Sequence, residues 1–319
     1  MLIELNNNLK DKIKVKIRIR IKEVKMIFKY TISKDDVLKY NSINDLLVKK
    51  LNFSTRLKSK VIDLKKVLYN NTFINTNSKL YANDILSIDF SYTEDNSNII
   101  STKMNLDIVY EDEWLIVLNK PAGIPIHPSR NNINNSFSNG IKAYFDEIKL
   151  NKKLRPVNRL DIDTSGLTIF AKCEYIQECL SKQMNLNIFE KYYLCLVLGI
   201  PRTTTGIINL PIGRNEDSII ERCIRPDGKP SITCYEVIKS NTALNISLVK
   251  CKLKTGRTHQ IRVHMKSINH PLLGDSLYNT TSDLISRQAL HCCHLKFIHP
   301  ITNTTIELFS NSPSDMDLI

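Results

Sequence analysis

Glycine is scarce in this sequence: 9 of 319 residues are glycine, and no two of them lie closer than seven positions apart. Dinucleotide-binding loops and Walker loops need glycines about two to five positions apart, because the backbone there must approach a phosphate group closely. The sequence therefore excludes both loops, and we expect no nucleotide cofactor.

Metal-binding motifs are missing as well. The sequence contains neither H-E-x-x-H nor C-x-x-C, and its 8 cysteines are scattered, which is typical of reduced thiols. The segment His291-Cys292-Cys293-His294 suggests zinc. If this segment is a strand, its alternate side chains point to opposite faces and the four ligands cannot converge. We expect no metal, so that any reaction is carried out by side chains alone.

Long apolar runs are absent too. No stretch of about 18 consecutive apolar residues occurs, so no transmembrane helix is expected. The first residues are rich in Asn and Lys and contain no apolar core before a small-residue cleavage site, so no signal peptide is expected either. These features predict a cytoplasmic protein without a membrane partner.

Basic residues, by contrast, are abundant. The chain has 45 Lys and Arg against 32 Asp and Glu, which gives a net charge of +13. Neutralising phosphates releases counterions and drives binding, so this excess favours a polyanionic partner. Net charge gives information about partners and solubility, but none about the fold.

The basic excess is strongest near the N-terminus. Charged and branched residues alternate strictly from Lys12 to Lys22, a period that indicates a strand with one cationic and one apolar face. An edge strand, a basic arm that becomes ordered on its partner, and an extension upstream of a start at Met26 remain open alternatives. We treat residues 1–25 as a basic N-terminal extension.

The remaining chain divides into two predicted folding units. Residues 26–92 predict a small α/β domain with a strand at 26–32, helical spacing at 33–49, a helix at 54–64 capped by Ser54, and three short strands. A polar linker is expected at 93–104. From 105 to 319 strands dominate, with helices at 174–185 and 258–269. This order predicts an α+β domain whose mixed, mainly antiparallel sheet is flanked by helices.

Three segments carry candidate functional residues. In NRLDIDTSGLTIFAK (158–172), the charge of Arg159 helps to keep the nearby Asp161 ionised. Taken alone, the same residues are also typical of a polar turn before a strand. In FEKYYLCLVLG (189–199), Tyr193 is either a core residue or a platform on which an unpaired base stacks. The third segment, 254–278, is either a solvated basic helix end or a phosphate-facing patch. Its basic residues are Lys254, Arg257, His259, Arg262, His264 and Lys266.

Together these segments resemble the RluA-type pseudouridine synthases. NRLDIDTSGLTIFAK is similar to the family motif H-R-L-D-x-x-T-S-G-L, and LNKPAGIPIHPS (118–129) to its K-P-x-G motif. KYYLCLVLG resembles the K-x-Y strand, TGRTHQIRVHM with HPLLGDSLY the G-R-x-H-Q-I-R motif, and RQALHCCHLKFIHPIT (287–302) the C-terminal strands. The likeness covers about residues 105–315, in the family's order. Residues 44–71 and 81–90 resemble the alpha-L RNA-binding module, although Lys65 and Lys66 replace its usual glycine turn.

The resemblance implies that the protein isomerises uridines of a structured RNA to pseudouridine, without cofactor or metal. It assigns Asp161 as the catalytic carboxylate and Arg262 as its ion-pair partner, with Arg257 as the alternative partner. It places Tyr193 against the target base and Arg159 in the gap left by the extruded uridine. Extrusion costs least in loops and bulges, so a structured single-stranded element is the expected target. The further RNA-binding residues that we predict are Lys254, His259 and Lys172.

The sequence gives less information about the substrate RNA and the oligomeric state. Large-subunit ribosomal RNA is the first expected substrate and transfer RNA the second, and we expect a monomer. Asn158 stands where the family usually has His; it cannot titrate near neutral pH, but the family mechanism gives that His no proton-transfer role. Two alternatives remain: a non-catalytic RNA-binding or ribosome-assembly protein, and a base-excising glycosidase. The glycosidase alternative is weakened, because such enzymes use two carboxylates and we assign Asp163 to the turn.

Overall fold

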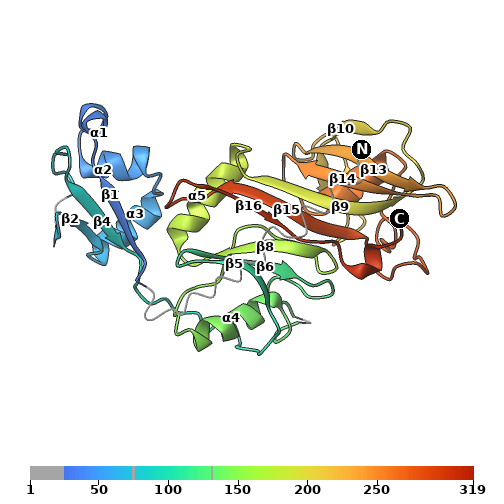
Figure 1. Cartoon of the computed structure of the whole chain (residues 1–319), viewed down its shortest axis with the longest axis horizontal. Helices are drawn as coiled ribbons and strands as arrows, with labels where there is room; N and C mark the ends of the chain where they lie inside the picture. The colour runs from blue at the N-terminus through green and yellow to red at the C-terminus, as the bar shows by residue number, and fades with distance from the viewer. Residues whose placement is uncertain (1–24, 74–75, 131) are drawn as a thin grey trace, which may run out of the picture.

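The computed structural model describes residues 25–73, 76–130 and 132–319. The predicted basic extension at 1–25 therefore lies outside the described residues, apart from Lys25. The described chain forms a small four-stranded sheet and a large sheet, and the larger unit also contains a two-stranded hairpin (Figure 1). None of the helices in the described ranges is long and apolar enough to cross a membrane.

The N-terminal unit is an antiparallel sheet covered by short helices. Its strands are ordered β1-β4-β2-β3, and Ser54 Oγ accepts a hydrogen bond from the Leu57 amide at 3.1 Å, which confirms the expected helix cap. The elements are β1 (Ile27–Thr31), α1 (Lys34–Lys39), α2 (Ile43–Asp45), a π-helical turn (Leu46–Lys50), α3 (Thr55–Asp63), β2 (Val67–Tyr69), β3 (Thr72–Phe73) and β4 (Ile85–Asp89).

The N-terminal unit packs against helix α5 (Glu174–Asn185) of the larger unit. The ring of Tyr175 on this helix lies 4.8–5.6 Å from those of Phe28, Phe53 and Phe90. The segment 93–104, predicted as a linker, contains no helix or strand. The side chain of its Glu94 is only 4% exposed and accepts hydrogen bonds from Arg155 at 2.6 and 2.7 Å. Aromatic burial holds the two units in contact, and this ion pair attaches the segment between them to the larger unit.

The large sheet has the strand order β10-β13-β14-β9-β15-β8-β6-β5, with β16 beside β15 and β7 beside β8. Among the strand pairs of this sheet in the described residues, only β8–β15 is parallel, which confirms the predicted mixed, mainly antiparallel sheet. Its strands are β5 (Asp107–Glu111), β6 (Leu115–Lys120), β7 (Arg155–Pro156), β8 (Ser165–Ala171), β9 (Glu190–Leu198), β10 (Thr205–Asn209), β13 (Ile232–Asn241), β14 (Ile246–Leu253), β15 (Leu290–Ile298) and β16 (Thr305–Phe309).

Helices cover this sheet on both faces. Along β6, Leu115 and Val117 face the main core, whereas Ile116 and Leu118 pack under helix α4 (Phe137–Glu147), as the two-residue period of a strand requires. The sequence did not predict α4. Its Gly140 weakens the helical pattern, but a Cβ there would lie 2.8 Å from Met104, so tertiary packing explains the glycine.

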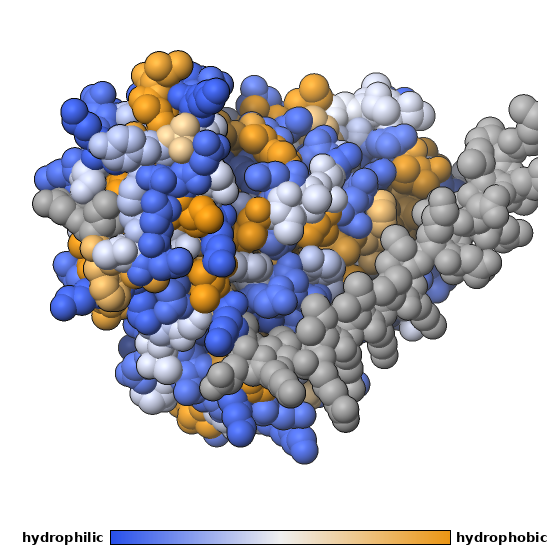
Figure 2. Space-filling view, turned by 60° about the vertical axis from the view of Figure 1, so that its left-hand side comes forward, coloured by the Kyte–Doolittle hydropathy of each residue, from blue (hydrophilic) through white to orange (hydrophobic). Residues whose placement is uncertain are grey.

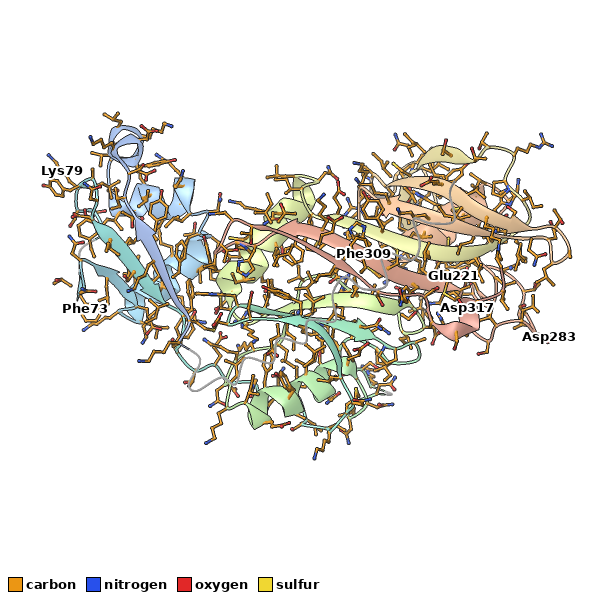
Figure 3. The ribbon with its side chains drawn as sticks, in the orientation of Figure 1. Phe73, Lys79, Glu221, Asp283, Phe309 and Asp317 are labelled. Atoms are coloured by element: carbon orange, nitrogen blue, oxygen red, sulfur yellow. The ribbon has the colours of Figure 1, made fainter. Side chains whose placement is uncertain are left out.

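The remaining elements lie at the far end of the molecule. They are the hairpin β11 (Ile212–Arg214) and β12 (Arg222–Ile224), helix α6 (Gln260–Ser267) and the 3₁₀ turn Ser314–Met316. Glu221, in the hairpin, and Asp283 mark this end, and Phe73 and Lys79 of the N-terminal unit mark the other (Figure 3). Hydrophilic side chains cover most of the face in Figure 2, and the hydrophobic ones form small separate groups. This face offers a hydrophilic rather than a broad apolar surface to a partner.

Gly166 allows the parallel contact at the centre of the sheet. It pairs with Cys292 of β15, its φ is +111°, and a Cβ at this position would lie 2.3 Å from the Cys292 carbonyl oxygen. No side chain fits between the two backbones. The glycine of the T-S-G segment is therefore required by the approach of β8 to β15.

We expect Gly166→Ala to destabilise the protein by at least about 2 kcal/mol, because the methyl group adds overpacking to backbone strain. The free energy of unfolding, measured by urea denaturation, checks this. Gly123→Ala is the matched control: Gly123 also has a positive φ, +81°, but nothing lies within 4 Å of its Cβ position. Equal losses in both variants would refute the backbone contact as the cause.

Candidate active site

A tight turn just before β8 presents Asp161. The Thr164 amide donates to the Asp161 carbonyl at 3.1 Å and closes the turn. Two cations hold the next two carbonyl groups: the Lys120 ammonium donates to Ile162 at 2.8 Å, and the Arg287 guanidinium donates to Asp163 at 3.0 Å. The backbone from Asp161 to Thr164 is thereby fixed.

Arg262, on helix α6, is shared between two carboxylates. It donates two hydrogen bonds of 2.7 Å to Asp275, which is fully buried, and its NH1 lies 3.3 Å from Asp161 Oδ2. Burial lowers the pKa of Arg262, but the hydrogen bonds and charge of Asp275 outweigh it and raise the pKa above its usual value. A permanent positive charge therefore faces Asp161.

His259 is the second polar neighbour of Asp161. Its Nδ1 lies 2.8 Å from the Tyr278 hydroxyl, which itself accepts a hydrogen bond from the Arg222 amide at 2.7 Å. We assign Tyr278 as the donor to Nδ1, so that a neutral His259 carries its own proton on Nε2. Nε2 lies 3.9 Å from Asp161 Oδ2. Burial lowers the pKa of His259, against the opposing charge of Asp161, so the neutral form is favoured.

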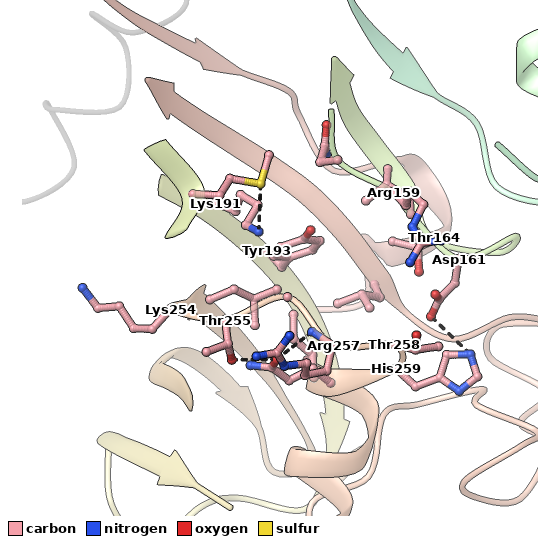
Figure 4. A pocket seen from close by; sticks show the side chains of 18 of the residues that line it. Arg159, Asp161, Thr164, Lys191, Tyr193, Lys254, Thr255, Arg257, Thr258 and His259 are labelled. Carbon is pink, nitrogen blue, oxygen red and sulfur yellow. Dashed lines mark hydrogen bonds and ion pairs between the residues drawn. The ribbon is translucent and has the colours of Figure 1, made fainter. Parts of the chain in front are cut away.

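A pocket of about 660 Å³ opens beside Asp161 (Figure 4). We call it the Asp161 pocket. Asp161 is the only carboxylate among the residues that line it. The pocket brings together all but one of the site residues predicted from the sequence: Arg159, Asp161, Tyr193, Lys254, Arg257, His259 and Arg262.

A second cavity of about 470 Å³ adjoins this pocket. We call it the arginine-lined cavity. The two share Arg159, Gly256, Arg257 and Thr258. Six cationic side chains and one carboxylate, Asp227, line the arginine-lined cavity. The cations are Arg159, Arg214, Arg222, Arg225, Lys229 and Arg257. Such a concentration of positive charge attracts a phosphate backbone.

Comparison with known proteins identifies the family. A profile described as RNA pseudouridylate synthase matches residues 114–267. The RNA pseudouridine synthase YhcT of Bacillus subtilis is 37% identical over 79% of this chain and 83% of its own length. This chain belongs to the RNA pseudouridylate synthase family. It is an enzyme that isomerises uridine to pseudouridine in RNA, and the resemblance seen in its motifs is confirmed.

Two further relatives agree. Ribosomal large subunit pseudouridine synthase D of Nitrosomonas europaea is 33% identical over 80% of this chain and 76% of its own length. The solved structure of Human RNA Pseudouridylate Synthase Domain Containing 1 superimposes with a TM-score of 0.56 at 27% identity. That match covers 67% of this chain and 86% of the human one. The pseudouridine synthase fold predicted from the sequence is thus confirmed.

Two predicted residues have surroundings that the sequence did not indicate. Lys172 does not reach the Asp161 pocket, so its assignment to RNA binding is corrected: its side chain is fully buried and donates to Glu111 at 2.8 Å. It lies in the bend directly after β8. Arg257 lines the pocket but is exposed and donates to the Pro230 carbonyl at 3.2 Å, so Arg262 rather than Arg257 pairs with Asp161.

The segment between His291 and His294 is part of strand β15. His291 Nδ1 lies 2.9 Å from the Ser165 hydroxyl, whereas His294 Nε2 lies 2.9 Å from Glu307. The two imidazoles thus have separate partners. Within the described ranges, no three His, Cys, Asp or Glu side chains are placed to hold a metal ion together.

Asn158 replaces the family's usual His in a structural position. Its buried amide donates to the Leu167 carbonyl at 3.1 Å, and its oxygen accepts from the Ile169 amide at 2.9 Å. Its side chain therefore joins the turn to β8 with the same donor and acceptor pattern that the backbone of a neighbouring strand would use. Both bonds use a donor and an acceptor that need no titration.

Four residues of the site were quoted within motifs but not singled out from the sequence. Lys120, Asp275 and Lys191 lie in the K-P-x-G, HPLLGDSLY and K-x-Y segments, and Tyr278 ends HPLLGDSLY. The carboxylate of Asp275 and the ring of Tyr278, 4.9 Å from Arg262, confine that guanidinium. The positions of these four residues within family motifs could have indicated them. Their contacts could not be predicted, because they depend on segments that are distant in the sequence.

Lys120 gives the site a pH dependence. Burial lowers its pKa to about 7, although the charges of Asp163 and Asp161 oppose this. Its ammonium donates to the carbonyls of Pro121, Ile124 and Ile162 at 2.7–2.8 Å. A neutral amine has two protons and leaves one of these carbonyls without a donor.

We therefore expect the rate of pseudouridine formation to fall about tenfold as the pH rises above about 7, because the Asp161 turn loses a charged hydrogen bond. Rate measurements from pH 6 to 9, in steps of about half a unit, check this. Lys120→Met should give a lower, flat profile over this range. Lys142→Met, on α4 and outside the pocket, is the control and should keep the wild-type profile. A decline of the same size in Lys120→Met would contradict the assignment.

Proposed function

We propose that this enzyme forms pseudouridine in large-subunit ribosomal RNA, with Asp161 as its catalytic carboxylate. The observation that carries the assignment of Asp161 is its position as the only carboxylate in a pocket that also contains Arg262 and Tyr193. The substrate is inferred from the relatives named ribosomal large subunit pseudouridine synthase D. We further propose that the protein acts as a monomer in the cytoplasm.

The ion pair supports a role for Asp161 in either route of the reaction. Whether the carboxylate attacks the anomeric carbon or promotes elimination from the sugar, it must be ionised. Arg262 places its positive charge 3.3 Å from this carboxylate and is itself held in place by Asp275. The neutral His259 directs a proton donor rather than a second charge toward Asp161. The pocket residue Tyr193 packs against the target base.

The arginine-lined cavity provides a path for the RNA strand that flanks the target uridine. It begins at Arg159 and Arg257, which it shares with the Asp161 pocket, and continues under the β11–β12 hairpin. Arg159 is exposed at this junction and can fill the gap left by an extruded base. Lys254 contributes a further exposed cation on the pocket side. The N-terminal unit adds RNA contacts in this proposal.

Asp161→Asn should slow pseudouridine formation by at least about 10³-fold, since it removes the reacting charge. It should not weaken RNA binding. Carbodiimide-dependent reverse-transcription stops, mapped on total RNA from cells with and without the gene, check this and reveal the modified positions. The stops should return with wild type and with the neighbouring control Asp163→Asn, but not with Asp161→Asn. Stops outside large-subunit RNA would replace the proposed substrate, and release of free uracil would indicate a glycosidase.

The charge of Arg214 should contribute to RNA affinity, because no carboxylate pairs with it in the described chain. Arg214→Ala should weaken binding severalfold and reduce the slope of log affinity against log salt by about 0.7 for one lost phosphate contact. Arg225→Ala is the matched control within the same cavity. Arg225 already forms a two-bond ion pair with Asp227, so its loss should have a smaller effect. Equal salt slopes in wild type and Arg214→Ala would refute the proposal that the RNA strand follows the arginine-lined cavity.

A further inference from the structure

Lys191 is a buried cation without a counter-charge. Its side chain projects from β9, the residue is only 8% exposed, and no carboxylate forms an ion pair with it in the described ranges. Its ammonium lies 3.9 Å from the sulfur of Met184, a weak acceptor. Burial lowers the pKa of Lys191. An unpaired buried charge is costly, so its retention calls for a partner that arrives with the substrate.

The position of Lys191 restricts that partner. Lys191 and Tyr193 are two residues apart on β9, so both side chains face the Asp161 pocket. In Figure 4 the ring of Tyr193 lies between the Lys191 side chain and Asp161. Across the pocket, a Cβ on Gly256 would lie 3.2 Å from Lys191 Nζ, so the absence of a side chain there leaves room for the ammonium.

The reaction generates a negative charge at this place. When the bond between uracil N1 and the sugar C1′ breaks, the electron pair stays on the base and spreads over N1, O2 and O4. The base then turns, C5 forms the new bond to C1′, the C5 proton is lost and N1 gains a proton. No electrons or atoms are left over. Between the two bonds, the detached uracil needs a cation near its carbonyl oxygens.

We propose that Lys191 donates a hydrogen bond to a carbonyl oxygen of the target uracil and stabilises the negative charge of the detached base. The inference rests on the proposed function, because a uracil held on Tyr193 with its sugar at Asp161 directs its carbonyl edge away from Asp161. Lys191 transfers no proton in this step; its contribution is electrostatic.

A phosphate group is the less suitable partner. Apolar side chains of Phe189 and Leu253 line the same pocket, and Lys191 is the only buried ammonium among the lining residues. A phosphate there would lose its hydration for one donor. The exposed cations Arg159, Lys254 and Arg257 lie where a backbone phosphate keeps contact with water.

Lys191→Met tests the proposal by separating the rate from stability. On a synthetic ribosomal RNA hairpin containing the mapped uridine, its single-turnover rate at saturating enzyme should fall about 10²–10³-fold with RNA affinity unchanged. Its melting temperature should rise, because an unpaired buried charge is removed. The matched control is Lys250→Met on the neighbouring strand β14, whose ammonium lies 5.1 Å from the Tyr192 ring and outside the pocket. It should keep the wild-type rate.

Hairpins with sulfur in place of O2 or O4 identify the contact. Sulfur accepts hydrogen bonds weakly, so one substitution should slow the wild type but have a much smaller effect on Lys191→Met. A lower melting temperature together with lost activity would overturn the proposal in favour of a structural lysine. Lost affinity with a reduced salt slope would overturn it in favour of a phosphate contact. A wild type that forms no pseudouridine in any RNA would refute the proposed function itself, and the role of Lys191 with it.

Discussion

The shared guanidinium of Arg262 is the interaction on which the site depends. If Arg262 had only one carboxylate beside it, the two charges would neutralise each other, and the arginine would not attract a second carboxylate. Here Asp275 binds two nitrogens of Arg262 at 2.7 Å and offsets its burial, and NH1 remains available to Asp161 at 3.3 Å. The longer contact holds the Asp161 carboxylate less tightly than the Asp275 carboxylate. Gly274 makes the turn to Asp275 possible through its φ of +69°.

The large sheet brings these groups together from distant parts of the chain. Asp161 and Arg262 are separated by 101 positions. The Asp161 turn precedes β8, Lys191 and Tyr193 lie on β9, and α6 follows β14. Between β8 and β9 lies β15, whose parallel start beside Gly166 places the turn level with the pocket face of β9. The close backbone contact at Gly166 and the ion pair at Arg262 therefore support the same geometry.

The cationic side chains around this site lie in two environments, one buried and one exposed to water. Lys120, Lys191 and Arg262 are all buried, yet they differ in what they contact. Lys120 holds the turn, Lys191 faces the pocket, and Arg262 pairs with Asp161. The exposed cations of the arginine-lined cavity remain in water, where they favour binding without a large desolvation cost. At the opposite end, apolar packing around Tyr175 fixes the position of the N-terminal unit.

The sequence by itself determined the family and the α+β class, and it predicted seven residues that line the Asp161 pocket, because motifs and the alternation of strands are written directly in the order of the residues. It identified Asp161 and favoured Arg262 as its partner. Tertiary structure alone decided that Lys172 is buried against Glu111, that Asn158 bridges to β8, and that Asp275 holds Arg262. Helix α4, weakened by Gly140, likewise formed through packing. Burial and the meeting of distant charges depend on which strands become neighbours, and no local pattern encodes that.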